Sequence, residues 1–438
     1  MTGGRRAWDR EIARLAVPAF GALIAEPLYL LADTAVVGHL GTTQLAGLAV
    51  AASVLLTAHA ICTFLAYGTT AAVARLLGAG DEREAAHQAV QGVWLGAFLG
   101  LALAALGFVF AGPLVGALAD DPAVAQEAEI YLRISLPGLP ALLVVLAGTG
   151  YLRGLQDTRT PLVVSLASAL LNLVIELVLV YGFDQGIGAS ALATVLAQWS
   201  AAAVYLRVIG RSARSRGVAL GPHSSSLRRL LVVARPLVVR TTALRGSLVL
   251  ATAVAARIGT TDLAAHQIAF ELWAALALAL DAVAIAGQAI TGRLLGAGDD
   301  ASARDAGRRM LEVGFGAGVV AAVLVVAARP LLPELFTDDP AVIAVCAFIL
   351  WHVAALQPLN AVAFVLDGLL IGAGDLNFLA RAMVGAAVVF AAGAAAVLAL
   401  DLGIGWLWAA IGLFMSARAV PLLIRWQSGA WAVTGATR

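Results

Sequence analysis

Twelve apolar segments constrain this chain more than any other feature. Each contains 18 or more mainly apolar residues, and a helix needs about 20 to cross a bilayer. Twelve spans therefore need at least about 240 of the 438 positions, which leaves room for short loops and termini. Their approximate limits are 14–38, 45–74, 86–112, 124–151, 160–182, 188–209, 229–257, 262–292, 305–328, 341–371, 377–400 and 403–425.

Composition agrees with this assignment. Apolar residues make up 61% of the chain and charged residues 13%, whereas soluble domains average about 45–50% and about 25%. Such an excess of apolar residues does not fit inside one water-soluble core. We therefore expect an all-α polytopic membrane protein with almost no domain outside the bilayer.

The second half of the chain repeats the first 218 residues later, with position 18 falling on position 236. The heptapeptide RLLGAGD ends at Asp81 and again at Asp299, and DDPAV ends at Val124 and again at Val342. Chance similarity between apolar helices would not reproduce Gly, Pro and Asp in register across several loops. The chain is therefore predicted to be a duplicated six-helix unit with parallel repeats.

The arginines predict how the chain lies in the membrane. All 28 basic residues are arginine, which indicates a GC-rich bacterial genome, and most of them fall in the termini and in alternate loops. By the positive-inside rule both termini are cytoplasmic, in a multi-pass protein of the bacterial cytoplasmic membrane. The predicted domains are an N-terminal lobe at 1–210, a cytoplasmic linker rich in Ser and Arg at 211–228, and a C-terminal lobe at 229–438.

No catalytic motif is present. The sequence contains no P-loop, no HExxH, no CxxC and no nucleophile elbow. The Gly-Ala-Gly-Asp turns follow predicted helices rather than strands, so we interpret them as helix-ending turns. Cys62 and Cys346 lie in apolar runs and indicate neither a disulfide framework nor a metal site, and no stripe of basic residues predicts a nucleic-acid partner.

A few polar residues interrupt the apolar spans of the first half. A charged side chain at the centre of a membrane helix costs about 2.5–3.5 kcal/mol to insert into the bilayer. Glu26 and Asp33 are seven residues apart in the first span and therefore share a helix face. Asn172 and Glu176 are spaced i,i+4 in the fifth span, and Thr194 lies in the sixth. These oxygens predict a site that exchanges protons or holds a hard cation such as Na⁺. The alternative for Asn172 and Thr194 is a helix-bridging hydrogen bond.

The second half carries a different set of polar residues, none of which corresponds in the repeat to Asp33 or Glu176. A buried arginine normally needs an anionic partner, so we predict a structural network in which Arg240 or Arg245 pairs with Asp281 or Asp367. Binding of substrate or protons is the alternative. The polar residues are Arg240, Arg245, Glu271, Asp281, Asn360 and Asp367.

Several stretches together resemble the multidrug and toxic compound extrusion (MATE) transporters, in particular their DinF-like branch. They are LADTAVVGHLG at 31–41, the two RLLGAGD loops, ALDAVAIAGQAITGRLLGAGD at 279–299 and LDGLLIGAGD at 366–375. The resemblance covers essentially the whole chain. It implies twelve helices in two lobes around a central cavity, and a cation-coupled antiporter that works by alternating access.

The resemblance also implies roles for individual residues. The family's first-helix aspartate corresponds to Asp33, and its upstream bending proline corresponds to Pro18. Its asparagine and acid of the fifth helix correspond to Asn172 and Glu176, and its sixth-helix threonine to Thr194. The acid is commonly Asp in the family and is Glu here, which favours H⁺ over Na⁺, and Glu26 is a further candidate for protonation.

We therefore expect an antiporter that exports small organic, amphipathic or cationic compounds in exchange for H⁺ or Na⁺, without any other cofactor. Its expected partners are the small-molecule substrate and the lipid bilayer, and we expect a monomer. One alternative is an exporter of organic anions or a lipid-precursor flippase of the same architecture. The remote alternative is a membrane-embedded enzyme, for which the six histidines show no ligand spacing.

Overall fold

The chain folds into α-helices joined by short connections. A computed structural model describes the backbone of residues 2–183 and 186–437 and the side chains from Arg5 onward, and no strand occurs among these residues. Twelve helical segments in this part of the chain are long and apolar enough to cross a membrane. The predicted all-α polytopic fold with twelve spans is thereby confirmed.

The first six spans extend from α1 to α8. Their elements are α1 (Thr2–Gly38), α2 (Thr42–Cys62), α3 (Phe64–Gly78), α4 (Glu82–Gly116), α5 (Pro122–Ser135), the 3₁₀ turn η1 (Leu136–Gly138), α6 (Leu139–Gly154), α7 (Arg159–Leu177), the π turn η2 (Val178–Gly182) and α8 (Ile187–Ser215). The other six are formed by α9 (Ser224–Ile258), α10 (Thr260–Gly296), α11 (Asp300–Ala328), α12 (Pro340–Gly372), α13 (Leu376–Ala399) and α14 (Ile404–Gln427), with the 3₁₀ turn η3 (Pro333–Leu335) before α12.

Two of the first six spans are interrupted helices. The span at Thr42–Gly78 breaks at Thr63, between α2 and α3. The span at Pro122–Gly154 narrows to the 3₁₀ turn η1, which contains Pro137. A proline has no N–H to donate to the preceding turn, so it breaks the regular helix there.

The predicted linker at 211–228 is helical at both ends. Helix α8 continues to Ser215 and α9 already begins at Ser224, so that eight residues between them lie outside the helices. The apolar pattern ends earlier than the helices because a helix that leaves the bilayer can continue in water with polar Ser and Arg residues.

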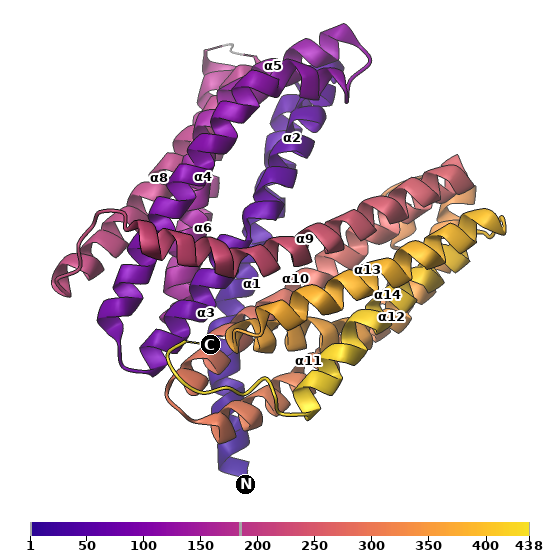
Figure 1. Ribbon diagram of the computed structural model, residues 1–438. Coiled ribbons are helices and arrows are strands. Elements are labelled where there is room, and N and C mark those ends of the chain that lie inside the picture. Colours follow the sequence, from indigo (N-terminus) through magenta and orange to yellow (C-terminus); the bar gives the residue numbers. More distant parts are fainter. Residues whose placement is uncertain (1, 184–185, 438) are drawn as a thin grey trace. The chain divides into compact units, whose positions relative to one another are not determined.

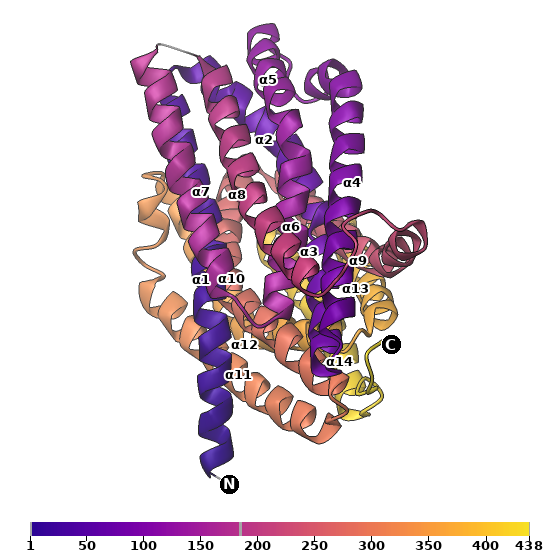
Figure 2. The ribbon, with the colours of Figure 1, turned by 90° about the vertical axis from the view of Figure 1, so that its left-hand side faces the viewer.

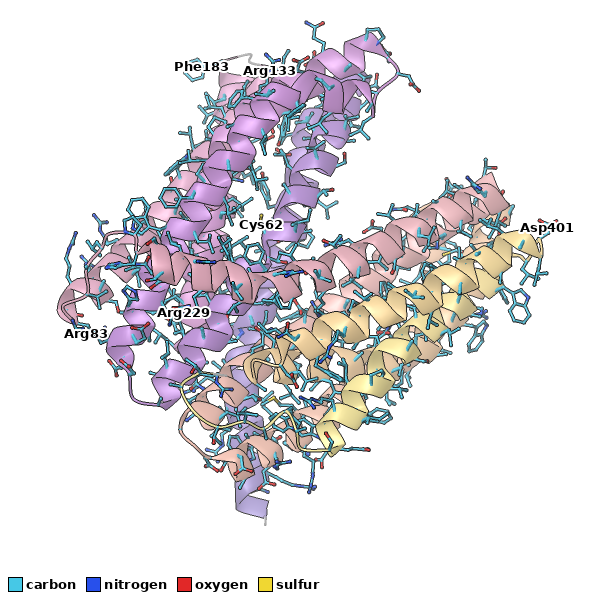
Figure 3. All side chains as sticks on the ribbon, in the orientation of Figure 1. Cys62, Arg83, Arg133, Phe183, Arg229 and Asp401 are labelled. Carbon is cyan, nitrogen blue, oxygen red and sulfur yellow. The ribbon has the colours of Figure 1, made fainter. Side chains whose placement is uncertain are left out.

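The contacts divide the chain into two compact units, each built around six spans. One unit, the N-terminal unit, consists of residues 21–234, and the other, the C-terminal unit, consists of residues 1–20 with 235–438. In the N-terminal unit α4, α6, α8 and α7 lie side by side (Figure 2). Its spans run between an end that carries Arg83 and an opposite end that carries Arg133 and Phe183 (Figure 3). In the C-terminal unit α12 packs against α10, α11 and α14, and α13 lies along α14 (Figure 1).

The first twenty residues join the C-terminal unit through a cluster of ion pairs. Arg309 of α11 donates to both carboxylate oxygens of Asp9, at 2.6 and 3.1 Å, and also to Glu312 at 2.7 Å. Arg293 at the end of α10 donates to Glu11 at 2.7 Å. The boundary between the two units falls inside two continuous helices, after Phe20 in α1 and after Ala234 in α9.

Glycines allow the central helices of each unit to touch backbone to backbone, and they do so in repeat-equivalent positions. A Cβ on Gly150 of α6 would lie 2.6 Å from the carbonyl oxygen of Ala66 in α3. A Cβ on Gly372 of α12 would lie 2.5 Å from the carbonyl oxygen of Gln288 in α10, and Gly368, the repeat counterpart of Gly150, contacts Ala284. Small residues that admit this close approach stabilise helix pairs in membranes.

The repeated loop motifs form the same turn and cap in both halves. Gly80 and Gly298 adopt φ values of +76° and +81°, which favour glycine. The next residue caps the following helix: the Asp81 carboxylate accepts the N–H of Glu84, and the Asp299 carboxylate accepts the N–H of Ser302, each at 2.9 Å. The interpretation of these motifs as helix-ending turns is confirmed.

The close helix contacts predict where a larger side chain is not tolerated. Gly372→Val and Gly150→Val should each lower the free energy of unfolding by about 1–3 kcal/mol, because the new atoms collide with backbone that cannot move aside. Thermal unfolding in detergent measures this loss. Gly385→Val in α13 is the control, since a Cβ there meets no atom within 4 Å. Equal melting temperatures for all three variants would contradict the packing argument.

The Asp299 cap predicts a pH dependence of stability. The hydrogen bond from the Ser302 N–H holds the pKa of Asp299 below its ordinary value. A lowered folded-state pKa stabilises the fold at neutral pH, and this contribution is lost as the pH falls through that pKa. The melting temperature of Asp299→Ala should therefore lie below that of the wild type at pH 7, and the gap should close in acid. A gap that is constant from pH 7 to strong acid would contradict the ionised cap.

Candidate functional site

Two buried carboxyl groups meet inside the N-terminal unit. Asp33 of α1 is 2% exposed and Glu176 of α7 is 0% exposed. Their side chains are in direct contact, and the Asp33 carboxyl group also contacts the Tyr131 side chain of α5. The Ser190 hydroxyl of α8 donates to Asp33 Oδ1 over 2.5 Å. Four helices therefore contribute to this site.

A second layer of polar groups lies one helical turn away and centres on Thr194 of α8. The amide of Asn172 donates to Thr194 Oγ1 over 3.1 Å, and the Tyr29 hydroxyl lies 2.7 Å from the same atom. The hydroxyl of Tyr131 interacts with both Thr194 and Ser190. The site is thus a connected cluster of carboxyl, hydroxyl and amide groups.

The spacing of these residues explains why the helices bring them together. Each of three helices supplies two of them, four residues apart and therefore on one face. The pairs are Tyr29 and Asp33 in α1, Asn172 and Glu176 in α7, and Ser190 and Thr194 in α8. Helix α7 changes to the π turn η2 two residues beyond Glu176, and such turns are frequent beside functional sites.

Among the described residues, no cationic side chain balances the two carboxyl groups. The side chains that interact with Asp33 and Glu176 in the described part of the chain are acids and hydroxyls, with no arginine or histidine among them. Both carboxylate oxygens of Glu176 and the Oδ1 atom of Asn172 are buried without a hydrogen-bond partner. Two adjacent buried carboxylates cannot both carry a charge at tolerable cost. The site is therefore suited to hold a proton or a small hard cation.

No group of three or more His, Cys, Asp or Glu side chains that could hold a metal ion occurs among the described residues. An Na⁺ ion would use the carboxylate oxygens of Asp33 and Glu176 and the amide oxygen of Asn172, which are hard ligands.

Glu26 lies apart from the carboxyl pair. Its Oε1 atom is 3.5 Å from Nδ1 of His59 in α2, and its side chain is half-exposed. Pro18, the predicted hinge, lies in α1 two residues before the chain crosses between the units. Pro236, its counterpart in the repeat, lies in α9 just after the second crossing.

The C-terminal unit contains a different polar cluster. Arg240 of α9 donates to Asp367 Oδ2 of α12 over 2.5 Å, and Arg418 of α14 donates to the same oxygen. The guanidinium of Arg418 also lies over the Phe364 ring, 4.9 Å from its centroid. Asn360 is 1% exposed, and its Oδ1 atom has no hydrogen-bond partner. Of the two pairings predicted for Asp367, the structure has the one with Arg240.

Arg245 and Asp281 are the remaining predicted members. Arg245 is exposed on α9 and makes no ion pair among the described residues, while Asp281 of α10 is partly buried. Sequence reasoning missed Arg418, although it is a charged residue in a predicted span. It also missed Tyr29 and Ser190, which stand four residues before Asp33 and Thr194 and were detectable by that spacing.

The carboxyl site has no counterpart in the second half. The repeat places Ala251 where Asp33 would be and Ala394 where Glu176 would be. Trp408 stands at the position of Ser190, and all three residues belong to the apolar core of the C-terminal unit. The two halves therefore share a scaffold but differ in chemistry.

Comparison with known proteins agrees with the duplicated architecture. The sequence model of the MatE family matches residues 18–178 and again residues 236–396. The chain belongs to the MatE family. MatE proteins are transporters, so this chain is a multidrug and detoxification transporter of that family and not an enzyme.

Relatives match the chain along nearly its full length. Protein DETOXIFICATION 44, chloroplastic, of Arabidopsis thaliana is 34% identical over 437 residues, which cover 96% of this chain and 81% of that protein. DNA damage-inducible protein F of Escherichia coli (strain K12) is 28% identical over 434 residues, which cover 97% and 94%. The DinF-like resemblance of this MatE chain agrees with the second match.

Solved MATE structures share the fold. A MATE in complex with MaD3S superposes with a TM-score of 0.87 at 20% identity and covers 97% of both chains. An outward-facing multidrug resistance MATE transporter superposes with the same TM-score and covers 97% of this chain and 96% of that one. At this identity the likeness establishes the MatE fold.

The two polar clusters predict that loss of an acid lowers the stability of the C-terminal unit but not that of the N-terminal unit. Asp367→Asn removes the anion shared by Arg240 and Arg418, and breaking a buried ion pair costs about 3–5 kcal/mol of the free energy of unfolding. Asp33→Asn removes no cation's partner and should leave the melting temperature equal to or above that of the wild type. Thermal unfolding of both variants in one detergent decides this, and a larger loss in Asp33→Asn would contradict the assignment.

Proposed function

We propose that this MatE transporter is a secondary active antiporter, which exports small organic compounds of amphipathic or cationic character in exchange for H⁺. The observation that carries the proposal is the carboxyl pair of Asp33 and Glu176, which is buried without a cation. Such a pair changes charge when a proton binds, so proton binding and substrate binding can be linked.

The carboxyl pair suggests how the exchange would proceed. Protonation of Asp33 and Glu176 from the outside would neutralise the site and rearrange α1 near Pro18, which lowers the affinity of the N-terminal unit for substrate. The substrate then leaves outward and the proton leaves inward. A proton can drive this change only because it binds the two states with different affinity, and here the differing interaction is that of the neutralised carboxyl groups.

We place the protein in the bacterial cytoplasmic membrane, as a monomer with both termini cytoplasmic. The excess of arginine in the termini and in alternate loops supports this orientation. The names of its relatives, which include detoxification proteins and a multidrug resistance transporter, support an efflux function.

Na⁺ is the second candidate for the coupling ion. The unpartnered oxygens of Glu176 and Asn172 favour a cation in the site, whereas the longer arm of Glu176, compared with an aspartate, favours H⁺. Transport driven by an imposed pH gradient and by an imposed Na⁺ gradient, measured in the same vesicles, distinguishes the two ions.

An organic anion is the second candidate for the substrate. Two guanidinium groups, those of Arg240 and Arg418, converge on one carboxylate oxygen of Asp367, and such groups also bind the carboxylates or phosphates of a ligand. A panel of cationic, neutral and anionic compounds in the vesicle assay separates an exporter of anions or lipid precursors from an exporter of cations.

The role of Asp33 predicts the outcome of a coupling assay. In acid-loaded everted vesicles, substrate should release protons from the wild type, and Asp33→Asn should reduce this release by about tenfold or more, because a fixed neutral amide cannot exchange a proton. Asp120→Asn is the control, since Asp120 is exposed in a loop. Undiminished proton release in Asp33→Asn would contradict the proposal.

A further inference from the structure

The Glu26–His59 pair lies on the same helix face as the carboxyl site but nearer the N-terminal end of α1. Glu26 precedes Asp33 by seven residues, which corresponds to about 10 Å along the helix. Because the N-terminal end of α1 is the predicted cytoplasmic end, the pair lies on the cytoplasmic side of Asp33 and Glu176.

Tyr29 lies between the Glu26–His59 pair and the carboxyl site. It lies on α1 three residues after Glu26 and four residues before Asp33, and therefore on the same helix face as both. Its hydroxyl is hydrogen-bonded to Thr194, so it is already part of the polar cluster. The Tyr29 side chain therefore lies along α1 between the carboxyl pair and Glu26.

The pair differs from the carboxyl site in access and in charge. The side chain of Glu26 is 49% exposed and that of His59 is 20% exposed, whereas Asp33 and Glu176 are buried. The other titratable groups around this part of α1 are Tyr29 and Asp33 on α1 itself, Cys62 one turn further along α2, Tyr131 of α5 and Glu176 of α7. His59 is the one member of this set that becomes a cation when it is protonated.

This composition makes the charge of the pair depend on protons. With a neutral imidazole the pair carries the single negative charge of Glu26, and one added proton makes it a neutral ion pair. A neutral pair is the less costly state inside a membrane span. The pair can therefore take up a proton and later give it to water without leaving a net charge on the loaded state.

We propose that Glu26 and His59 form the station through which the coupling proton leaves the carboxyl site toward the cytoplasm. The inference rests on the proposed H⁺ antiport. An O–H bond of the Asp33–Glu176 pair breaks and an N–H bond of His59 forms, while the Tyr29 hydroxyl and intervening water pass the proton along. His59 or Glu26 then releases the proton to water on the cytoplasmic side.

The test uses the full-length protein reconstituted in liposomes, with ethidium as the probe. Glu26→Gln and His59→Gln should each slow ethidium transport driven by a pH gradient by about tenfold or more, as expected for loss of a positioned proton-transfer group. Ethidium counterflow at equal pH, which requires no net proton movement, should keep the wild-type rate. The double variant should match the single variants, because the two residues act as one unit, and free imidazole should restore the rate of His59→Ala.

Two results would overturn the proposal. Wild-type rates in the gradient-driven assay would show that protons do not pass through the pair. Equal losses in gradient-driven transport and in counterflow, together with a lower melting temperature, would show a purely structural ion pair. His39→Gln is the matched control, since His39 lies at the other end of α1 and bonds the Ala35 carbonyl.

Asp33→Asn in the same liposomes separates this inference from the proposed function. If the wild type shows no gradient-driven transport, or if Asp33→Asn keeps it, the H⁺ antiport itself fails. If Asp33→Asn loses transport while Glu26→Gln and His59→Gln keep it, only the exit station fails.

Discussion

The contact between Asp33 and Glu176 is the interaction around which the polar cluster of the N-terminal unit is arranged. Two carboxyl groups inside an apolar bundle are stable only if the surrounding side chains donate hydrogen bonds and a proton or cation reduces their charge. Ser190, Tyr131 and the cluster around Thr194 meet the first requirement. Among the described residues, no cationic side chain meets the second requirement at this site.

In the C-terminal unit, side chains of the same unit compensate the charge of a buried acid. Asp367 is as deeply buried as Asp33, but Arg240 and Arg418 both contact it. Its charge is therefore compensated by the fold in every ionic condition. The buried acids of one unit are surrounded by acids and hydroxyls, whereas the buried acid of the other unit is contacted by two arginines.

Periodic features were predictable from the sequence, and tertiary features were not. Apolar runs fixed the number of spans, and the i,i+4 spacing of Asn172 and Glu176 placed both on one face of α7. The pairing of Arg240 and Arg418 with Asp367 depends on how α9, α12 and α14 pack, which no local pattern encodes. The same holds for the contact between His59 and Glu26. It depends on the position of α2 beside α1, and no sequence pattern predicts it. The helical ends of the linker were not predicted, because hydropathy shows which residues lie in the bilayer and does not show where a helix begins or ends.

The backbone contacts at Gly150 and Gly372 have a consequence for how such a protein diverges after gene duplication. These contacts hold each copy together through main-chain atoms and a few glycines, so the copies can exchange the side chains elsewhere without losing their shape. In the second copy Ala251 and Ala394 stand where the first copy has Asp33 and Glu176, although the helix packing is the same. Both copies keep the same helix packing, whereas only the first copy has the buried pair of acids.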